Sequence, residues 1–119
     1  MTAVTISFLG VRDAEIVARI HELCFDEDWD AATIKKVLAM QGAFGFTARA
    51  DPAGDIAGFA LARIVADECE LLSLAVAPNW RGLGIGGGLF DAAMVRACAL
   101  NAACFYLEVA EDNANALRL

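Results

Sequence analysis

Apolar and polar residues along this chain follow patterns that predict short strands and amphipathic helices. Alternation, or enrichment in β-branched and aromatic residues, predicts strands over Val4–Leu9, Ala43–Ala50, Ile56–Ala66, Cys69–Val76 and Cys104–Val109. Helical spacing of apolar residues predicts helices from Asp13 to Phe25, from Asp30 through Leu38, and from the glycines after Arg81 to about Asn101. Another helix is expected to begin at Asn113.

The order of these elements predicts the architecture. The turn-forming segment 51–55 joins two strands into an antiparallel hairpin, and a strand, a helix and a strand follow it. We therefore expect one domain over residues 1–119, of the α/β (α+β) class, with a mixed, mostly antiparallel sheet. Helices should cover both faces, and the central β-α-β unit should carry the glycine loop. In the first helix, Ile16, Val17, Ile20 and Leu23 should face the core, and Asp13 and Asp30 should cap the two N-terminal helices.

Composition excludes several functions. The net charge of −7 and pI near 4.5 argue against nucleic-acid binding and favour cationic partners such as amines or basic peptides. No apolar run is long enough to span a membrane, and the first residues do not resemble a signal peptide. The four cysteines lack metal-ligand spacing, so we expect buried free thiols, no metal site and a cytoplasmic protein.

The most informative segment is the glycine loop that follows the apolar run ending at Val76. Its glycines open a helix, so free backbone N–H groups and the positive helix end converge where a phosphate-bearing ligand can bind. A tight turn that merely needs glycine is the alternative without function. Gly82, Gly84 and Gly87 also fit a dinucleotide-binding fingerprint, with Glu108 near the ribose position, but five residues separate the strand from the first glycine. A P-loop fits the segment less well still, because no Lys-Ser or Lys-Thr follows the glycines.

An Arg-x-x-Gly-x-Gly pattern begins at Arg81, five residues beyond the strand. There the chain resembles the GNAT superfamily of acetyl-coenzyme A-dependent N-acetyltransferases. The segment Leu107–Ala116 is similar to the L-E-V-x-x-x-N-x-x-A stretch of the ribosomal-protein-alanine (Rim-type) branch, and Phe25–Asp30 is loosely similar to that branch's aromatic loop. The resemblance extends over nearly the whole chain.

The resemblance implies that acetyl-coenzyme A is the co-substrate and that the acceptor is a primary amine. The acceptor amine is expected at a peptide or protein N-terminus, and a ribosomal protein is one candidate partner. It implies that the strand backbone pairs with the pantetheine arm, that loop N–H groups hold the diphosphate, and that Asn113 bonds the cofactor near its reactive end. The implied cofactor-binding residues are Leu74, Ala75, Val76, Arg81, Gly82, Leu83, Gly84, Ile85, Gly86, Gly87 and Asn113. Rim-type enzymes often carry a basic residue at position 87, so Gly87 predicts weaker cofactor binding.

The resemblance also assigns Glu108 as the general base, and a carboxylate within an apolar strand is costly unless it has a partner or a role. A carboxylate reaching water at a strand end is the structural alternative. The family's general-acid tyrosine and two closing strands have no counterpart before Leu119. We therefore expect slow transfer and pairing with a second copy along the exposed C-terminal edge. A non-catalytic acyl-coenzyme A-binding module is the alternative function.

Overall fold

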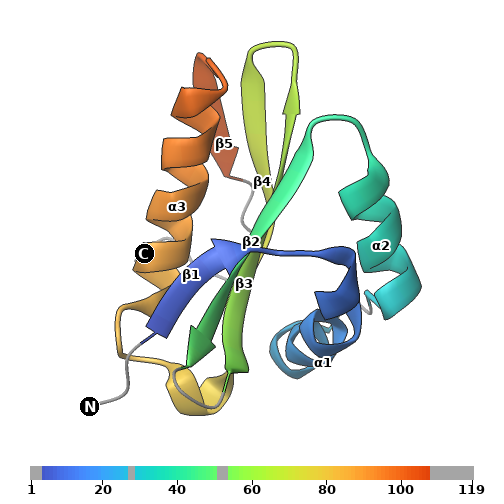
Figure 1. Cartoon of the computed structure of the whole chain (residues 1–119), viewed down its shortest axis with the longest axis vertical. Coiled ribbons are helices and arrows are strands. Elements are labelled where there is room, and N and C mark those ends of the chain that lie inside the picture. The colour runs from blue at the N-terminus through green and yellow to red at the C-terminus, as the bar shows by residue number, and fades with distance from the viewer. Residues whose placement is uncertain (1–3, 27–28, 51–53, 108–119) are drawn as a thin grey trace.

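The computed structural model (Figure 1) describes residues 4–26, 29–50 and 54–107. Within these residues the strands form a single sheet in the order β1-β2-β3-β4-β5, antiparallel throughout except for the parallel pair β4 and β5. The strands are β1 (Val4–Phe8), β2 (Ala43–Ala50), β3 (Asp55–Val65), β4 (Glu68–Val76) and β5 (Cys104–Leu107). The helices are α1 (Ala14–Cys24), α2 (Ala31–Ala39) and α3 (Ile85–Ala99), with short 3-10 turns η1 (Val11–Asp13) and η2 (Pro78–Trp80). The predicted mixed sheet with a β4-α3-β5 unit is confirmed.

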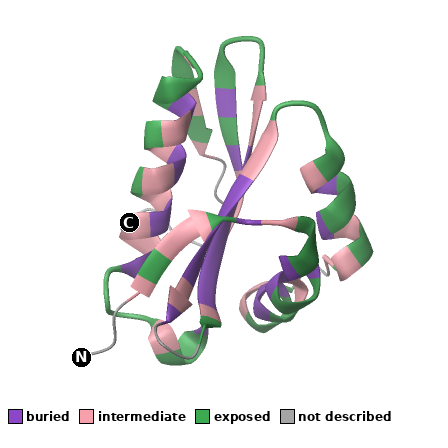
Figure 2. Ribbon diagram, in the orientation of Figure 1, coloured by how far each residue is buried: buried purple, intermediate pink, exposed green. Residues whose placement is uncertain are grey.

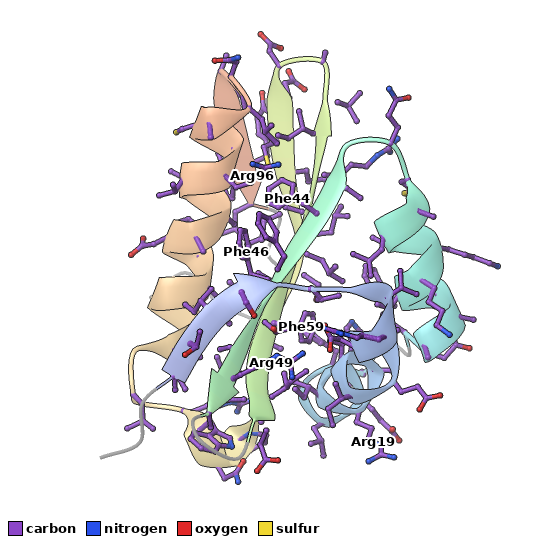
Figure 3. All side chains as sticks on the ribbon, in the orientation of Figure 1. Arg19, Phe44, Phe46, Arg49, Phe59 and Arg96 are labelled. Carbon is purple, nitrogen blue, oxygen red and sulfur yellow. The ribbon has the colours of Figure 1, made fainter. Side chains whose placement is uncertain are left out.

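Helix α3 covers one face of the sheet, and α1 and α2 cover the other, as Figure 1 shows. The two faces bury separate apolar clusters, and the central strands carry most of the buried positions in Figure 2. Phe46 packs in the cluster beneath α3, whereas Phe59 packs in the cluster beneath α1 and α2 (Figure 3). Because both faces are covered, β2 and β3 are mostly apolar, whereas β4 begins with the exposed Glu68 and Glu70 and is apolar mainly in its second half.

The inner face of α1 differs from the prediction. Val17 and Ile20 are buried as expected, but Ile16 is 36% exposed and Leu23 is 66% exposed. The buried stripe runs instead through Ala14, Val17 and His21, at spacings of three and four. Counting only large aliphatic residues shifted the predicted face, because a small alanine and an aromatic histidine also pack inward here.

The two predicted caps behave differently. The carboxylate of Asp30 accepts a 2.8 Å hydrogen bond from the Thr33 N–H, as expected of an N-cap, and this bond lowers the pKa of Asp30. The carboxylate of Asp13 makes no capping bond to α1. It accepts a hydrogen bond from the Gly10 N–H and forms a 2.6 Å ion pair with Arg49, so it ties β2 to the start of the first helix.

The four cysteines are free, but only Cys69 is buried. Cys98 and Cys104 are exposed, because α3 turns one side to solvent and β5 is the last strand of the described sheet. The expectation of buried thiols is therefore wrong for these two. Pairing of a second copy along this side of the sheet stays a prediction.

The turn between α2 and β2 offers a test of how tightly the helix is tied to the sheet. Gly42 has φ +83°, and a Cβ there would overlap the Ile64 carbonyl oxygen; Gly54 has φ +77° but nothing within 4 Å. Both substitutions by alanine carry a left-handed backbone cost of about 1–2 kcal/mol. We expect Gly42→Ala to add about 1–3 kcal/mol for the overlap. Urea unfolding should therefore separate the two variants, and equal losses of stability would contradict this packing.

Candidate functional site

The glycine loop lies between the end of β4 and the start of α3. Gly82 and Gly84 have φ of +80° and +81°, and Gly84 is the N-cap of α3. A Cβ built at either position would meet no atom of the protein within 4 Å. The glycines are therefore required by the backbone conformation and not by contacts within the protein, and the space in front of them is open to a ligand.

The start of α3 presents a row of free donors. The first intrahelical bond at this end runs from the Gly88 N–H to the Gly84 carbonyl, at 3.1 Å. The N–H groups of Ile85, Gly86 and Gly87 precede it and have no carbonyl to reach within the helix. Together with the helix dipole, they suit the diphosphate of an adenine-nucleotide cofactor.

The side chains in and next to the loop either pack in the core or point to solvent. The side chain of Ile85 is buried in the cluster beneath α3, whereas Leu83 is 66% exposed at the tip of the loop. At Gly88 a Cβ would lie 2.9 Å from the Ile6 Cδ1 atom of β1. Helix α3 therefore packs closely on the sheet at Gly88, and the loop can offer a ligand mainly its backbone.

Arg81 makes contacts within the protein. Its Nε donates a 3.0 Å hydrogen bond to the Val76 carbonyl, and its Nη2 lies 3.3 Å from the Cys24 Sγ atom. The Cys24 thiol also donates to the Val76 carbonyl, at 3.5 Å. Arg81 therefore joins the end of β4, the loop and the C-terminal end of α1. Sequence reasoning did not find Cys24, because no local pattern links positions 24 and 81.

Strand β4 contains a β-bulge directly upstream of this region. Leu61 pairs with Ser73 and Ala62 pairs with Leu71, so Leu72 has no partner on β3. Before the bulge Cys69 and Leu71 pack beneath α3, and after it Leu74 takes that side while Ala75 faces α1. The extra residue reverses which side chains face which helix layer, an effect typical of strands next to active sites.

The outer edge of β4 beyond the bulge carries the backbone groups that the sequence assigned to a cofactor. β5 pairs with β4 from Glu68 to Leu71 among the described residues. Because Ala77 donates its N–H to the Ala57 carbonyl of β3, alternation turns the peptide groups of Val76 and Leu74 toward the opposite edge. The Val76 carbonyl is taken by Arg81 and Cys24, so Leu74 is the better placed of the two to pair with a ligand.

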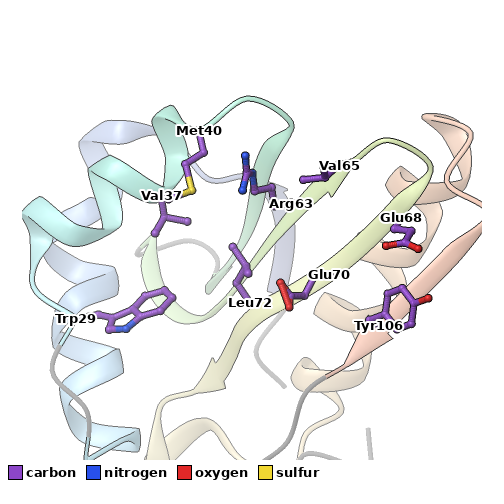
Figure 4. Close-up of a pocket in the computed structure, with 9 residues that line it drawn as sticks. All are labelled: Trp29, Val37, Met40, Arg63, Val65, Glu68, Glu70, Leu72 and Tyr106. Atoms are coloured by element: carbon purple, nitrogen blue, oxygen red, sulfur yellow. The ribbon is translucent and has the colours of Figure 1, made fainter.

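A cavity of about 440 Å³ opens on the α2 side of the sheet, beside the bulge (Figure 4). Its apolar wall comes from the α1–α2 connection, α2 and the bulge, and its polar wall from the ends of β3, β4 and β5. The lining residues are Trp29, Val37, Met40, Arg63, Val65, Glu68, Glu70, Leu72 and Tyr106. The sequence analysis did not predict this cavity, although alternation places Glu68, Glu70 and Tyr106 on one face once the register is known.

An aromatic cluster fixes Trp29 at the cavity wall. The ring of buried His21 stacks on the Trp29 indole at 5.1 Å and 6°, and it also contacts Phe25 and Phe59. His21 therefore serves as a packing residue between α1 and the cavity wall.

Two assigned residues, Glu108 and Asn113, lie outside the described residues. Among residues 4–26, 29–50 and 54–107, histidine, cysteine and carboxylate side chains nowhere gather in a group of three that could ligate a metal. No helix in these ranges has the length and apolarity needed to cross a membrane.

Comparisons with known proteins agree with this geometry. The model of the acetyltransferase (GNAT) family matches residues 14–119. The ribosomal-protein-bS18-alanine N-acetyltransferase of Escherichia coli is 28% identical over 115 residues, which are 97% of this chain and 76% of that protein.

Solved structures of similar fold include the same class of enzyme. The crystal structure of the ribosomal-protein-S18-alanine N-acetyltransferase from Escherichia coli superposes with a TM-score of 0.87 at 26% identity, covering 98% of this chain and 73% of that one. The structure of Ard1 from Thermoplasma volcanium gives a TM-score of 0.84 at 28% identity, covering 98% and 78%. Since the family model spans most of the sequence and the sheet carries the expected loop, the chain belongs to the acetyltransferase (GNAT) family.

Proposed function

We propose that the protein transfers the acetyl group of acetyl-coenzyme A to the α-amine of a peptide or protein N-terminus. The observation that carries this proposal is the pairing of two features across the β4 bulge. The open glycine loop and the N–H groups at the start of α3 follow Leu72 in the chain. The cavity that Leu72 lines opens on the α2 side of the sheet. A cofactor and an acceptor could thus meet at one point of β4.

The loop fits the cofactor by its chemistry. Gly82 and Gly84 leave open space, and the N–H groups of residues 85–87 are suited to a diphosphate. In this proposal the Leu74 peptide group pairs with the pantetheine arm, Arg81 holds the loop in place, and Asn113 acts near the reactive end. When bound, acetyl-coenzyme A supplies the acetyl group as a thioester.

An α-amine is the acceptor favoured by protonation. Acetyl transfer needs a neutral nitrogen. With a pKa of about 7.8 an α-amine is roughly 10–15% neutral at pH 7, whereas a lysine side chain is only about 0.04% neutral. The relatives named above include an enzyme whose name specifies an alanine of a ribosomal protein, and this supports an N-terminal acceptor.

The remaining catalytic groups belong to the proposal. Glu108 is assigned as the general base that takes the amine proton, directly or through water. Of the N–H groups near Leu74 and Ala75, the Leu74 N–H faces the open edge and is the candidate to polarise the thioester carbonyl. Tyr106 keeps its proton near neutral pH, because a phenol has an ordinary pKa of about 10, and the negative charge of Glu68 raises the pKa of Tyr106 further. Its hydroxyl is not assigned as the general acid.

Coenzyme A binding tests the loop. The parent protein should bind coenzyme A far more tightly than NAD, because the 3-10 turn η2 separates the strand end from the first glycine. Gly84→Val should remove coenzyme A binding, since a side chain would occupy the open space before the helix. Gly54→Val has similar left-handed backbone strain at a residue outside the glycine loop, where a Cβ has nothing within 4 Å, and should bind normally. Calorimetry that shows NAD preferred, or normal binding by Gly84→Val, would contradict the proposal.

Glu108→Gln tests the base. We expect the acetylation rate of an α-amine peptide to fall by about 10²-fold or more, a usual range for losing a general base. Coenzyme A affinity should stay unchanged, because the diphosphate site is formed by other residues. Glu15→Gln, at an exposed position of α1, is the control with the same chemical change. A parent-like rate for Glu108→Gln in a steady-state thiol-release assay would make Glu108 a structural carboxylate.

A further inference from the structure

The cavity beside the bulge has two chemically different walls. Trp29, Met40 and Leu72 contribute to the apolar wall, and Glu68 and Glu70 lie on the polar wall (Figure 4). Its volume of about 440 Å³ falls within the range of small-ligand pockets, about 300–1,000 Å³. It is therefore large enough for a long side chain that is apolar along its stem and polar at its end.

The charge of the polar wall is unbalanced. Arg63 lies opposite Glu70 in the register of β3 and β4, but its Nε donates to the Gln41 carbonyl at 3.2 Å. The one ion pair found among the described residues joins Arg49 to Asp13, remote from the cavity lining. Glu68 and Glu70 are thus exposed carboxylates without an ion-pair partner in the described part of the chain, and they outnumber the single guanidinium.

Strand alternation and register place these carboxylates on the same face of the sheet. Glu70 lies opposite Tyr106 of β5, and Glu68 lies opposite Cys104. Tyr106 adds no negative charge near pH 7, because a phenol has an ordinary pKa of about 10 and the charge of Glu68 raises the pKa of Tyr106 further. The two glutamates therefore provide the negative charge of the wall.

A lysine or arginine side chain complements both walls. Its aliphatic stem can pack on Met40 and Leu72 while its charged end stays at the polar, water-accessible side. The Trp29 ring, held by its stack on His21, adds a fixed apolar surface for the stem. An acidic side chain would be repelled by Glu68 and Glu70, and an apolar one would leave them without a partner.

We propose that this cavity selects acceptors that carry lysine or arginine directly after the residue whose α-amine is acetylated. The inference rests on the function proposed above, because it places the reacting amine at the β4 bulge beside Leu72. An extended peptide places the following side chain within one or two residue spacings, about 3.3 Å each, of the amine. Leu72 lines the cavity, so the next side chain is the one that enters it.

The test compares peptides that share an N-terminal alanine and differ only at the second residue: lysine, norleucine or glutamate. Norleucine keeps much of the stem and removes the charge. The parent protein should acetylate the lysine peptide about 5- to 30-fold more efficiently than the norleucine peptide, mainly through a lower KM, as expected for a partly exposed, charge-assisted contact. The glutamate peptide should be the poorest substrate, and added salt should weaken the preference for lysine.

The matching protein variants are Glu68→Gln, Glu70→Gln and their combination, with Glu15→Gln as the control outside the cavity. The ratio of kcat/KM for lysine over norleucine should fall toward one in the double variant and stay at the parent value in the control. Equal losses on both peptides would assign the carboxylates to the reacting amine and overturn the proposal. So would a parent protein without a preference for lysine.

Failure of the proposed function gives a different result. If no peptide α-amine is acetylated while coenzyme A binds, the acceptor class is wrong, whatever the second residue. Calorimetry with the same peptides then tests the cavity alone. Tighter binding of the lysine peptide that is lost in the double variant supports the charge preference, and equal binding of all peptides overturns it.

Discussion

The extra residue in β4 is the constraint on which the rest of the site depends. Upstream of Leu72 the strand pairs with both β3 and β5, and its exposed carboxylates line the cavity. Downstream of Leu72 the strand leads through η2 to the glycine loop, and the alternation of its side chains between the α3 side and the α1–α2 side of the sheet is reversed. In a regular strand, alternate residues share a face, so Ala75 would lie on the face opposite to Glu68 and Glu70. The extra residue in β4 instead lets Glu68 and Glu70 line the cavity while Ala75 packs against α1 on the same side of the sheet.

The loop and the acceptor side are also mechanically linked. Arg81 and Cys24 share the Val76 carbonyl, which joins the cofactor loop to the end of α1. The same end of α1 carries His21, whose ring supports Trp29 at the cavity wall. The C-terminal end of α1 therefore contacts both the cofactor loop and the cavity wall.

Sequence patterns predicted the elements, the mixed sheet and the glycine loop, because strand alternation, helical spacing and glycine spacing are local signals. They missed the exposure of Ile16 and Leu23 and the role of Asp13, which depend on packing and on Arg49, a distant residue. The bulge at Leu72 and the cavity also depend on register between strands. No single segment encodes that register. The place of Glu70 in the cavity wall and the contacts of Cys24 with β4 and Arg81 can therefore be identified only in the folded structure.

The central claim is that cofactor and acceptor meet at the β4 bulge, and a crystal structure with coenzyme A bound tests it most directly. The account predicts the diphosphate on the N–H groups between Gly82 and Gly87 and the thiol beside Leu72, facing the cavity that holds Glu70. A thiol on the α3 side of the sheet or away from β4, or a diphosphate bound elsewhere, would contradict it.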